Sequence, residues 1–246
     1  MTLTLKRKYR ALRIPTNPDH PKPDYNNTAG LGIATTLSYF LVIFYALFTS
    51  WNKTDNIGLS TNSQGRNSLT ISQLMYNSEK VVTFSTTFLF AFLGIYMLYR
   101  KNFFELEARR VAVCVVFALI PIAFILITFY GPKCNIHYFI AAAVFIGGTV
   151  IQYLILDLYK TYFEDDKALD VYESMVDTMV VFAIIITGIL IFSLVIKNSK
   201  KGLFPKELNW ITSDTLAISE YIHLTIYGGL LYLFSTFNGL PSLKYL

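Results

Sequence analysis

Apolar residues along this chain gather into six long, continuous runs separated by polar connections. The runs cover residues 30–50, 80–99, 110–130, 137–159, 176–196 and 215–237. Because a helix of about 20 residues rises 1.5 Å per residue, each run can cross a hydrocarbon layer of roughly 30 Å. The runs do not alternate between apolar and polar positions, as the strands of a membrane barrel do. The pattern therefore predicts an all-α fold, a polytopic transmembrane bundle of six helices.

The connections divide the chain into three parts. Residues 1–29 form a basic, Pro-rich tail, residues 30–237 the six-helix transmembrane domain, and residues 238–246 a short tail. The first tail lacks the apolar segment of a cleavable signal peptide, so we expect the first helix to act as the insertion signal. Of the 21 Lys and Arg residues, 13 face the cytosol if the N-terminus does. The positive-inside rule thus predicts that both termini are cytosolic, although four lysines in 197–214 oppose it.

Composition supports a membrane protein and excludes several kinds of site. Hydrophobic residues make up 54% of the chain and charged residues 15%, whereas about a quarter of the residues in a soluble domain are charged. The two cysteines, Cys114 and Cys134, lie at opposite ends of one predicted helix, too far apart for a disulfide. Cys114 has no Cys or His nearby, and Cys134 has only His137 three residues later, so neither has the four-ligand set of a structural zinc site. We therefore expect no metal and no cofactor.

The N-terminal tail carries a cluster of basic residues beside the first helix. Its members are Lys6, Arg7, Lys8, Arg10 and Arg13. Near a cytosolic leaflet, such a cluster attracts anionic lipid by about 1 kcal/mol per charge. The cluster is thus a candidate site for anionic lipids, including phosphoinositides, and the alternative is that these charges set only the topology.

Three ionisable residues fall within the predicted membrane helices. His137 begins the fourth helix, and Glu220 and His223 lie one turn apart near the start of the sixth. Residues three apart share a helix face, so Glu220 and His223 can point together. Because ionisable groups are costly at membrane depth, we take the three as a candidate polar cluster in the outer leaflet, with His137 at a similar or slightly shallower depth.

Three interpretations of this cluster stay open. A metal site would have three ligands of suitable type but would lack the further carboxylates of di-metal bundles. A hydrolase site would need a nucleophile, for which Ser219 is adjacent. A structural network or a lipid-headgroup contact needs no further residue, and we favour it.

The remaining polar and small residues predict packing. Asp157, near the inner end of the fourth helix, is expected to pair with Lys160 or to reach the interface. The inner loops 100–110 and 159–175 are opposite in charge and are expected to be solvated turns. Small residues that let helices approach closely mark the packing faces; they are Ala143, Gly147 and Gly148 on the fourth helix, Gly188 on the fifth, and Gly228 and Gly229 on the sixth.

Several short motifs resemble the DRAM, FRAG and SFK family of six-helix membrane proteins, the damage-regulated autophagy modulator-like proteins. They are Thr70-Ile71-Ser72 and Glu79 before the second helix, Tyr99-Arg100 at its end, His137-Tyr138 with Ala141, Phe145 and Gly147-Gly148 in the fourth, and Ser219-Glu220-Tyr221-Ile222 in the sixth. The resemblance covers about residues 30–240. The chain departs from the family pattern at Thr70 and Gln73, where a Pro and an acid are often seen.

The resemblance implies a non-enzymatic regulator or scaffold linked to phosphoinositide regulation, autophagy or membrane trafficking, at the plasma membrane or at an endolysosomal or Golgi membrane. Its partners would be membrane lipids and cytosolic or membrane proteins, not nucleic acid. The alternatives are an intramembrane lipid-modifying enzyme or GPI-lipid remodelling factor that uses His137, Glu220 and His223, an accessory subunit of a larger membrane complex, and a transporter. The last would predict an inverted repeat, and the two halves share only their hydropathy.

Overall fold

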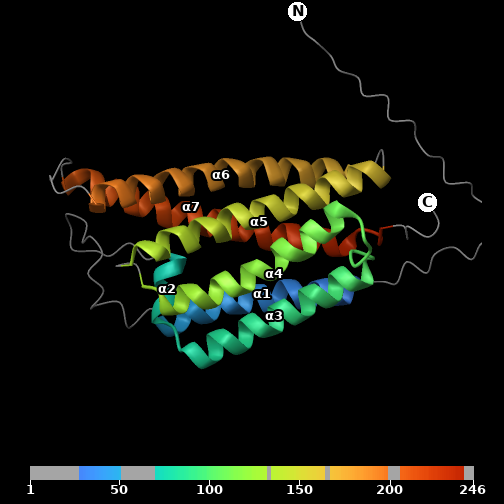
Figure 1. The fold of residues 1–246 in the computed structure, drawn as a ribbon, viewed down its shortest axis with the longest axis horizontal. Helices are drawn as coiled ribbons and strands as arrows, with labels where there is room; N and C mark the ends of the chain where they lie inside the picture. The colour runs from blue at the N-terminus through green and yellow to red at the C-terminus, as the bar shows by residue number, and fades with distance from the viewer. Residues whose placement is uncertain (1–27, 51–69, 132–133, 164–166, 199–205, 241–246) are drawn as a thin grey trace, which may run out of the picture.

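The computed structural model describes residues 28–50, 70–131, 134–163, 167–198 and 206–240, and over these residues the fold is all-helical. In chain order the helices are α1 (Ala29–Ser50), α2 (Ile71–Asn77), α3 (Lys80–Arg100), α4 (Ala108–Phe129), α5 (Asn135–Tyr162), α6 (Lys167–Asn198) and α7 (Lys206–Thr236). Figure 1 shows the six long helices side by side, with the short α2 at one end.

Five of the helices in the described part of the chain are long and apolar enough to cross a membrane. They are α1, α3, α4, α5 and α6. The predicted all-α fold is thus confirmed over the described residues, and the five apolar helices are consistent with the predicted multi-pass membrane architecture. The sixth predicted run, 215–237, lies in α7, which is not among the five. The structure also extends α6 by nine residues before the predicted start at 176, through the segment expected to be a loop.

The long helices pack in a closed ring. Each packs on the next in the order α1, α3, α4, α5, α6 and α7, and α7 returns to α1. A further contact joins α5 to α7, and α2 packs against α1, α4 and α7. We call the end that holds α2 the α2 end, and the opposite end, which holds residues 101–107 between α3 and α4, the clamp end (Figure 1).

Helix α1 has one face buried in the bundle and one face exposed at its surface. Leu37, Leu41 and Phe44 recur every three or four residues and are exposed, whereas Tyr39 and Val42 are fully buried. A helical spacing of three to four residues puts each set on its own face. The exposed face is as apolar as the buried one, which is what a helix in contact with lipid requires.

Small residues allow close approach at several helix contacts. A Cβ atom added to Gly94 of α3 would lie 2.1 Å from the ring of Phe117 on α4, and one added to Gly228 of α7 would lie 2.3 Å from Phe40 on α1. Of the predicted packing residues, Gly148 and Gly229 also lie close to neighbouring side chains. Ala143, however, is exposed, Gly147 has only an ordinary contact with Val116, and Gly188 has no atom within 4 Å of such a Cβ. On α5, Gly148 therefore lies nearer to neighbouring side chains than Gly147 does.

Candidate functional site

Glu220 on α7 binds the N-terminus of α2. Its carboxylate is fully buried, and Oε2 accepts a hydrogen bond from the backbone N–H of Ile71 at 2.8 Å. The N–H of Ser72 donates to the same carboxylate. The first N–H groups of a helix have no partner within it, so Glu220 satisfies donors that would otherwise be left unbonded inside the bundle.

The apolar face of α2 holds this short helix against the bundle. Ile71, Leu74 and Met75 are each at most 3% exposed, and the hydroxyls of Thr70 and Ser72 hydrogen-bond at 3.1 Å. The hydropathy pattern leaves residues 51–79 as a connection between two predicted spans and does not reveal α2, because a helix of seven residues is shorter than any membrane span. The structure brings two of the quoted motifs, Thr70-Ile71-Ser72 and Ser219-Glu220, into direct contact.

His223, one turn after Glu220, contacts α5 deep in the bundle. Its Nε2 lies 3.0 Å from the hydroxyl of Thr149, and its ring meets Phe145 edge to face with centroids 5.0 Å apart. The side chain is 1% exposed. This pair joins α5 to α7 through a hydrogen bond inside the bundle.

His137 lies well away from Glu220 and His223 along the bundle, so the structure does not bring the three predicted residues into one cluster. Its Nδ1 lies 2.7 Å from the carbonyl oxygen of Tyr130, at the end of α4. Thr149, the partner of His223, follows His137 by 12 residues on α5, which corresponds to about 18 Å of helix at 1.5 Å per residue. Glu220 and His223 stay neighbours on one helix face, while His137 instead fixes the α4–α5 turn.

Further buried polar side chains, which the sequence pattern did not single out, lie between His223 and the clamp end. Tyr172 on α6 donates its hydroxyl to Oε1 of Gln152 on α5, and the side chain of Gln152 also faces the hydroxyl of Tyr227 on α7. All three residues are at most 2% exposed. The spacing held the signal, because Thr149 and Gln152, like His223 and Tyr227, are one helical turn apart.

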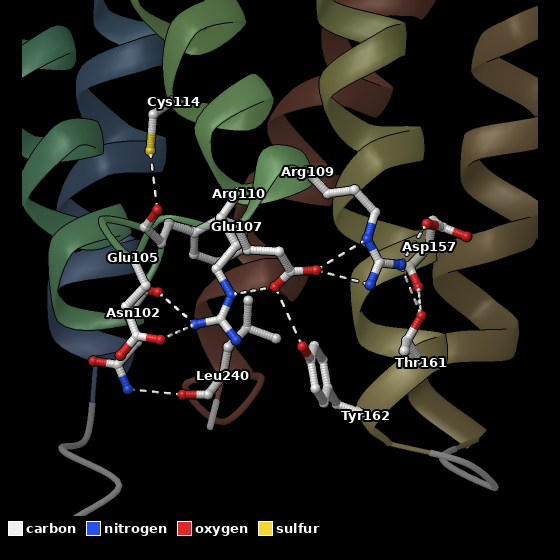
Figure 2. Close-up of polar contacts among 11 residues, drawn as sticks. Asn102, Glu105, Glu107, Arg109, Arg110, Cys114, Asp157, Thr161, Tyr162 and Leu240 are labelled. Carbon is white, nitrogen blue, oxygen red and sulfur yellow. Dashed lines mark hydrogen bonds and ion pairs between the residues drawn. The ribbon is translucent and has the colours of Figure 1, made fainter. Parts of the chain in front are cut away.

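At the clamp end, Arg110 is the centre of a buried ion-pair network (Figure 2). Its guanidinium is fully buried and bonds Glu107 at 2.8 Å, Glu105 at 3.0 Å and the carbonyl of Asn102 at 2.8 Å. Tyr162 on α5 donates to Glu107 at 3.2 Å. The loop 100–110 was predicted to be a solvated turn, and that is wrong, because its acids fold back on Arg110 and take it out of water.

Asp157 pairs with the adjacent Arg109 and not with the predicted Lys160. Arg109 bonds Glu107 at 2.8 Å and Asp157 at 2.9 Å, whereas Lys160 pairs with Glu173 on α6. The expected pair of Asp157 with Lys160 is therefore wrong. Arg109 lies on α4, and its side chain extends to α5. A contact between two helices cannot be predicted from residue spacing along one of them.

The clamp loop, residues 101–107, also binds the segment that follows α7. Lys101 is fully buried, and its Nζ donates to the carbonyls of Ser235 and Phe237 and lies 5.0 Å from the ring centre of Phe234. Burial lowers the pKa of Lys101 to about 7. The N–H of Leu240 donates to the carbonyl of Lys101 at 3.1 Å. Residues 238–240, expected to begin a cytosolic tail, are thus part of the folded bundle.

Asn102 completes this contact through an uncommon backbone conformation. Its φ of 61° lies in the left-handed region that Asn tolerates better than most residues. Its Nδ2 donates to the carbonyl of Leu240 at 2.7 Å, and from α5 the hydroxyl of Tyr159 donates to the carbonyl of Asn238 at 2.7 Å. The C-terminal segment is therefore bonded from two sides.

The other predicted site residues are placed as follows. Lys6, Arg7, Lys8, Arg10 and Arg13, the predicted lipid-binding cluster, lie outside the described residues. Cys114 and Cys134 are both free. Within the described ranges, no group of three His, Cys, Asp or Glu side chains is arranged to hold a metal ion.

Comparison of the chain with protein-family models, with curated proteins and with solved structures finds no match.

Proposed function

We propose that this chain is a non-enzymatic, multi-pass membrane regulator or scaffold with six spans and both termini in the cytosol. The sixth span would be α7, whose 31 residues correspond to about 46 Å of helix. This helix packs against α1, α5 and α6, so its polar residues can face protein instead of lipid. Polar residues on the inner face of a bundle are compatible with a membrane span.

The observation that best supports a non-enzymatic function is that Glu220 binds the backbone of α2. A catalytic carboxylate must reach a substrate or a metal, whereas Oε2 of Glu220 binds the backbone of α2. The ion pairs of Arg110 likewise connect parts of the same protein. Both features support a rigid body that presents its loops and tails to partners.

The motif resemblance adds the proposed context of this regulator. Membrane lipids, phosphoinositides among them, would be bound by the basic tail, and membrane or cytosolic proteins by the loops. The membrane would be the plasma membrane or an endolysosomal or Golgi membrane, and the regulated process phosphoinositide signalling, autophagy or trafficking.

The second candidate is an intramembrane lipid-modifying enzyme or GPI-lipid remodelling factor. What favours it is that Oε1 of Glu220 and Nδ1 of His223 have no hydrogen-bond partner among the described residues. An accessory subunit of a larger complex would be distinguished by stable co-purification with other chains.

Two measurements test the proposal, one on the full chain in cells and one on the purified full chain. When only the plasma membrane is permeabilised, protease should cleave epitope tags at both termini, and one cleaved tag with one protected tag would contradict the six-span topology. Incubation with radiolabelled phospholipids and GPI lipids should yield no product. A product that disappears in Glu220→Gln would establish the enzyme instead.

A further inference from the structure

The clamp loop presents two apolar side chains outward while it holds its carboxylates inward. Leu106 is 95% exposed, more than any other large apolar side chain among the described residues, and Phe104 is 56% exposed. Beside them in the sequence, Glu105 and Glu107 both bond the buried guanidinium of Arg110. Side chains along the loop thus alternate in direction, and the two apolar ones project from its outer side.

A tight turn fixes the position of Leu106. The N–H of Glu107 donates to the carbonyl of Glu105 at 2.8 Å, so the backbone reverses within three residues. The carboxylates of the same two residues share one guanidinium. A side chain in a loosely held loop could fold back to escape water. Leu106 stays outside because the bonds on both of its sides hold the turn that presents it.

Exposed aromatic rings connect the clamp loop to the outer face of α3. The rings of Tyr96 and Tyr99 stack with their centroids 6.4 Å apart, and the ring of Tyr99 meets that of Phe104 edge to face at 6.0 Å. The guanidinium of Arg100 donates to the hydroxyl of Tyr96 at 3.4 Å. One continuous surface therefore runs from the last turns of α3 onto the clamp loop.

The outer face of α3 indicates the depth of this surface in a membrane. Its exposed side chains are hydrocarbon at Phe88 and Phe92. They carry hydroxyls at Tyr96 and Tyr99, and the helix ends with Arg100. A spanning helix shows this order where it leaves the hydrocarbon, because tyrosine collects at the headgroup level and arginine extends its charge into it. The clamp loop, whose ring contacts the second tyrosine, then lies at the headgroup level too.

The charges around this surface suit a phospholipid. The carboxylates of Glu105 and Glu107 are bonded to Arg110 and Arg109, so their charges are balanced within the protein. Arg100, by contrast, takes part in none of the ion pairs between described residues. A guanidinium presents several donors and binds phosphate well. Its position beside exposed rings matches a lipid, in which a phosphate adjoins hydrocarbon.

We propose that the clamp loop is an interfacial anchor that binds phospholipid. Leu106 and Phe104 insert below the headgroups, and Arg100 binds a lipid phosphate. The lipid belongs to the bilayer that the helices cross. The anchor thereby ties to the membrane surface the same loop that bonds Arg110 and the segment after α7. This inference requires α3 to cross a membrane, but it does not depend on the regulatory function proposed above.

Spin labels on the full chain in phosphatidylcholine and phosphatidylglycerol vesicles measure this insertion. The chain would carry Cys114→Ala and Cys134→Ala, with one label on Leu106→Cys. Collisions with oxygen, which concentrates in lipid, and with a nickel chelate, which stays in water, report the depth. We expect several-fold fewer chelate collisions than at Asp170→Cys, an exposed site in the first turn of α6. The label should lie about 5–10 Å into the boundary between headgroups and acyl chains.

A second measurement leaves Leu106 in place, since a spin label is itself apolar. Phosphatidylglycerol with a diazirine at the start of an acyl chain should attach, on illumination, to residues 102–109 of the full chain. Leu106→Ser combined with Phe104→Ser should lower this adduct several-fold, and Leu106→Ser alone serves if the double variant does not fold. Arg100→Gln should lower it too. Lys160→Gln, the control, removes an exposed cation at the same end that is already paired and should not.

The proposal is overturned if the label at residue 106 meets the chelate as often as the label at residue 170, because the surface would then be open to water and to a protein partner. It is also overturned if the adduct on residues 102–109 is unchanged by the loss of Leu106 and Phe104. An adduct lowered equally by Arg100→Gln and Lys160→Gln would overturn the phosphate contact, since any cation at this end would then serve.

Discussion

At the scale of single residues, two buried charges bind backbone groups far away in the sequence. Glu220 holds the first N–H groups of α2, 149 residues earlier, and Lys101 holds a carbonyl 136 residues later. A buried charge is costly unless it is bonded. In each case main-chain groups left over at a helix end provide the bonds, so each charge connects two segments that helix packing alone would not fix.

Replacing Glu220 by alanine should destabilise the protein by about 1–3 kcal/mol, because the N–H groups of Ile71 and Ser72 lose their acceptor while staying buried. The free energy of unfolding, measured in detergent with increasing denaturant, checks this. Glu220→Gln should retain most of the stability. If the alanine and glutamine variants unfold alike, the carboxylate is not holding α2.

Gly94→Ala should destabilise the protein by about 1–3 kcal/mol, because the new methyl group would overlap the ring of Phe117 and force α3 and α4 apart. Gly188→Ala is the matched control, since its Cβ meets nothing within 4 Å and alanine favours a helix by up to about 1 kcal/mol. Thermal unfolding of the two variants should thus shift in opposite directions. Equal shifts would contradict the packing of α3 on α4.

Lys101 should make the stability of the protein rise with pH above neutrality. Its pKa falls from 10.5 to about 7 on folding, so between these values the folded chain has lost a proton that the unfolded chain keeps. Unfolding then takes up a proton, and the free energy of unfolding increases with pH. Below about pH 7 Lys101 is protonated in both the folded and the unfolded chain, so it no longer makes the free energy of unfolding depend on pH.

The Lys101→Met variant isolates this effect. Between pH 7 and about 9.5, its free energy of unfolding should change less steeply with pH than that of the wild type. Parallel curves for the two proteins would show that Lys101 keeps its proton when buried.

At the scale of elements, the α3–α4 connection is a folded unit whose bonds reach α5 and the segment after α7. Figure 2 shows Asn102, Glu105 and Glu107 around the Arg110 guanidinium, with Tyr162 and Leu240 approaching from the other two elements. Arginine suits this position because its planar group donates in several directions at once.

Arg110→Met should cost about 2–4 kcal/mol of stability, because it removes the cation that bonds Glu105 and one of the two that bond Glu107, while both carboxylates stay partly buried. Asp157→Asn is the contrasting change at the same end of the bundle. Its pair with Arg109 is half exposed, and such pairs contribute about 0–1 kcal/mol. Chemical denaturation of both variants measures the difference, and similar losses would show that burial of Arg110 does not set its contribution.

Helix positions could be predicted from the sequence where length and hydropathy determine them. They could not be predicted where contacts with other helices determine them. The runs that became α1, α3, α4 and α5 were placed within a few residues because lipid-facing and core-facing positions are both apolar there. The short α2 depends on Glu220 for its N-terminus, a residue in another helix. No pattern within residues 70–77 reveals that partner.

At the scale of the whole molecule, the ring of helices explains why some site residues could be predicted to lie together from the sequence and others could not. Spacing correctly predicts that Glu220 and His223 share a face, since that depends on one helix. The depth of His137 relative to them depends on how α5 and α7 are offset, which hydropathy does not encode. Gln152, Tyr172 and Tyr227 come together only when three helices pack, so single-helix patterns could not single them out.

The same long-range bonds set an order of events during synthesis. Lys101 is made 136 residues before the Phe237 carbonyl that it will bind, and at about 5–20 residues per second the wait is roughly 7–27 s. Throughout that interval the nascent clamp loop lacks the carbonyls of Ser235 and Phe237 that bond Lys101 in the folded protein. A chain that stops short of Phe237 would not form the complete contact, and its lifetime in the cell should be correspondingly short.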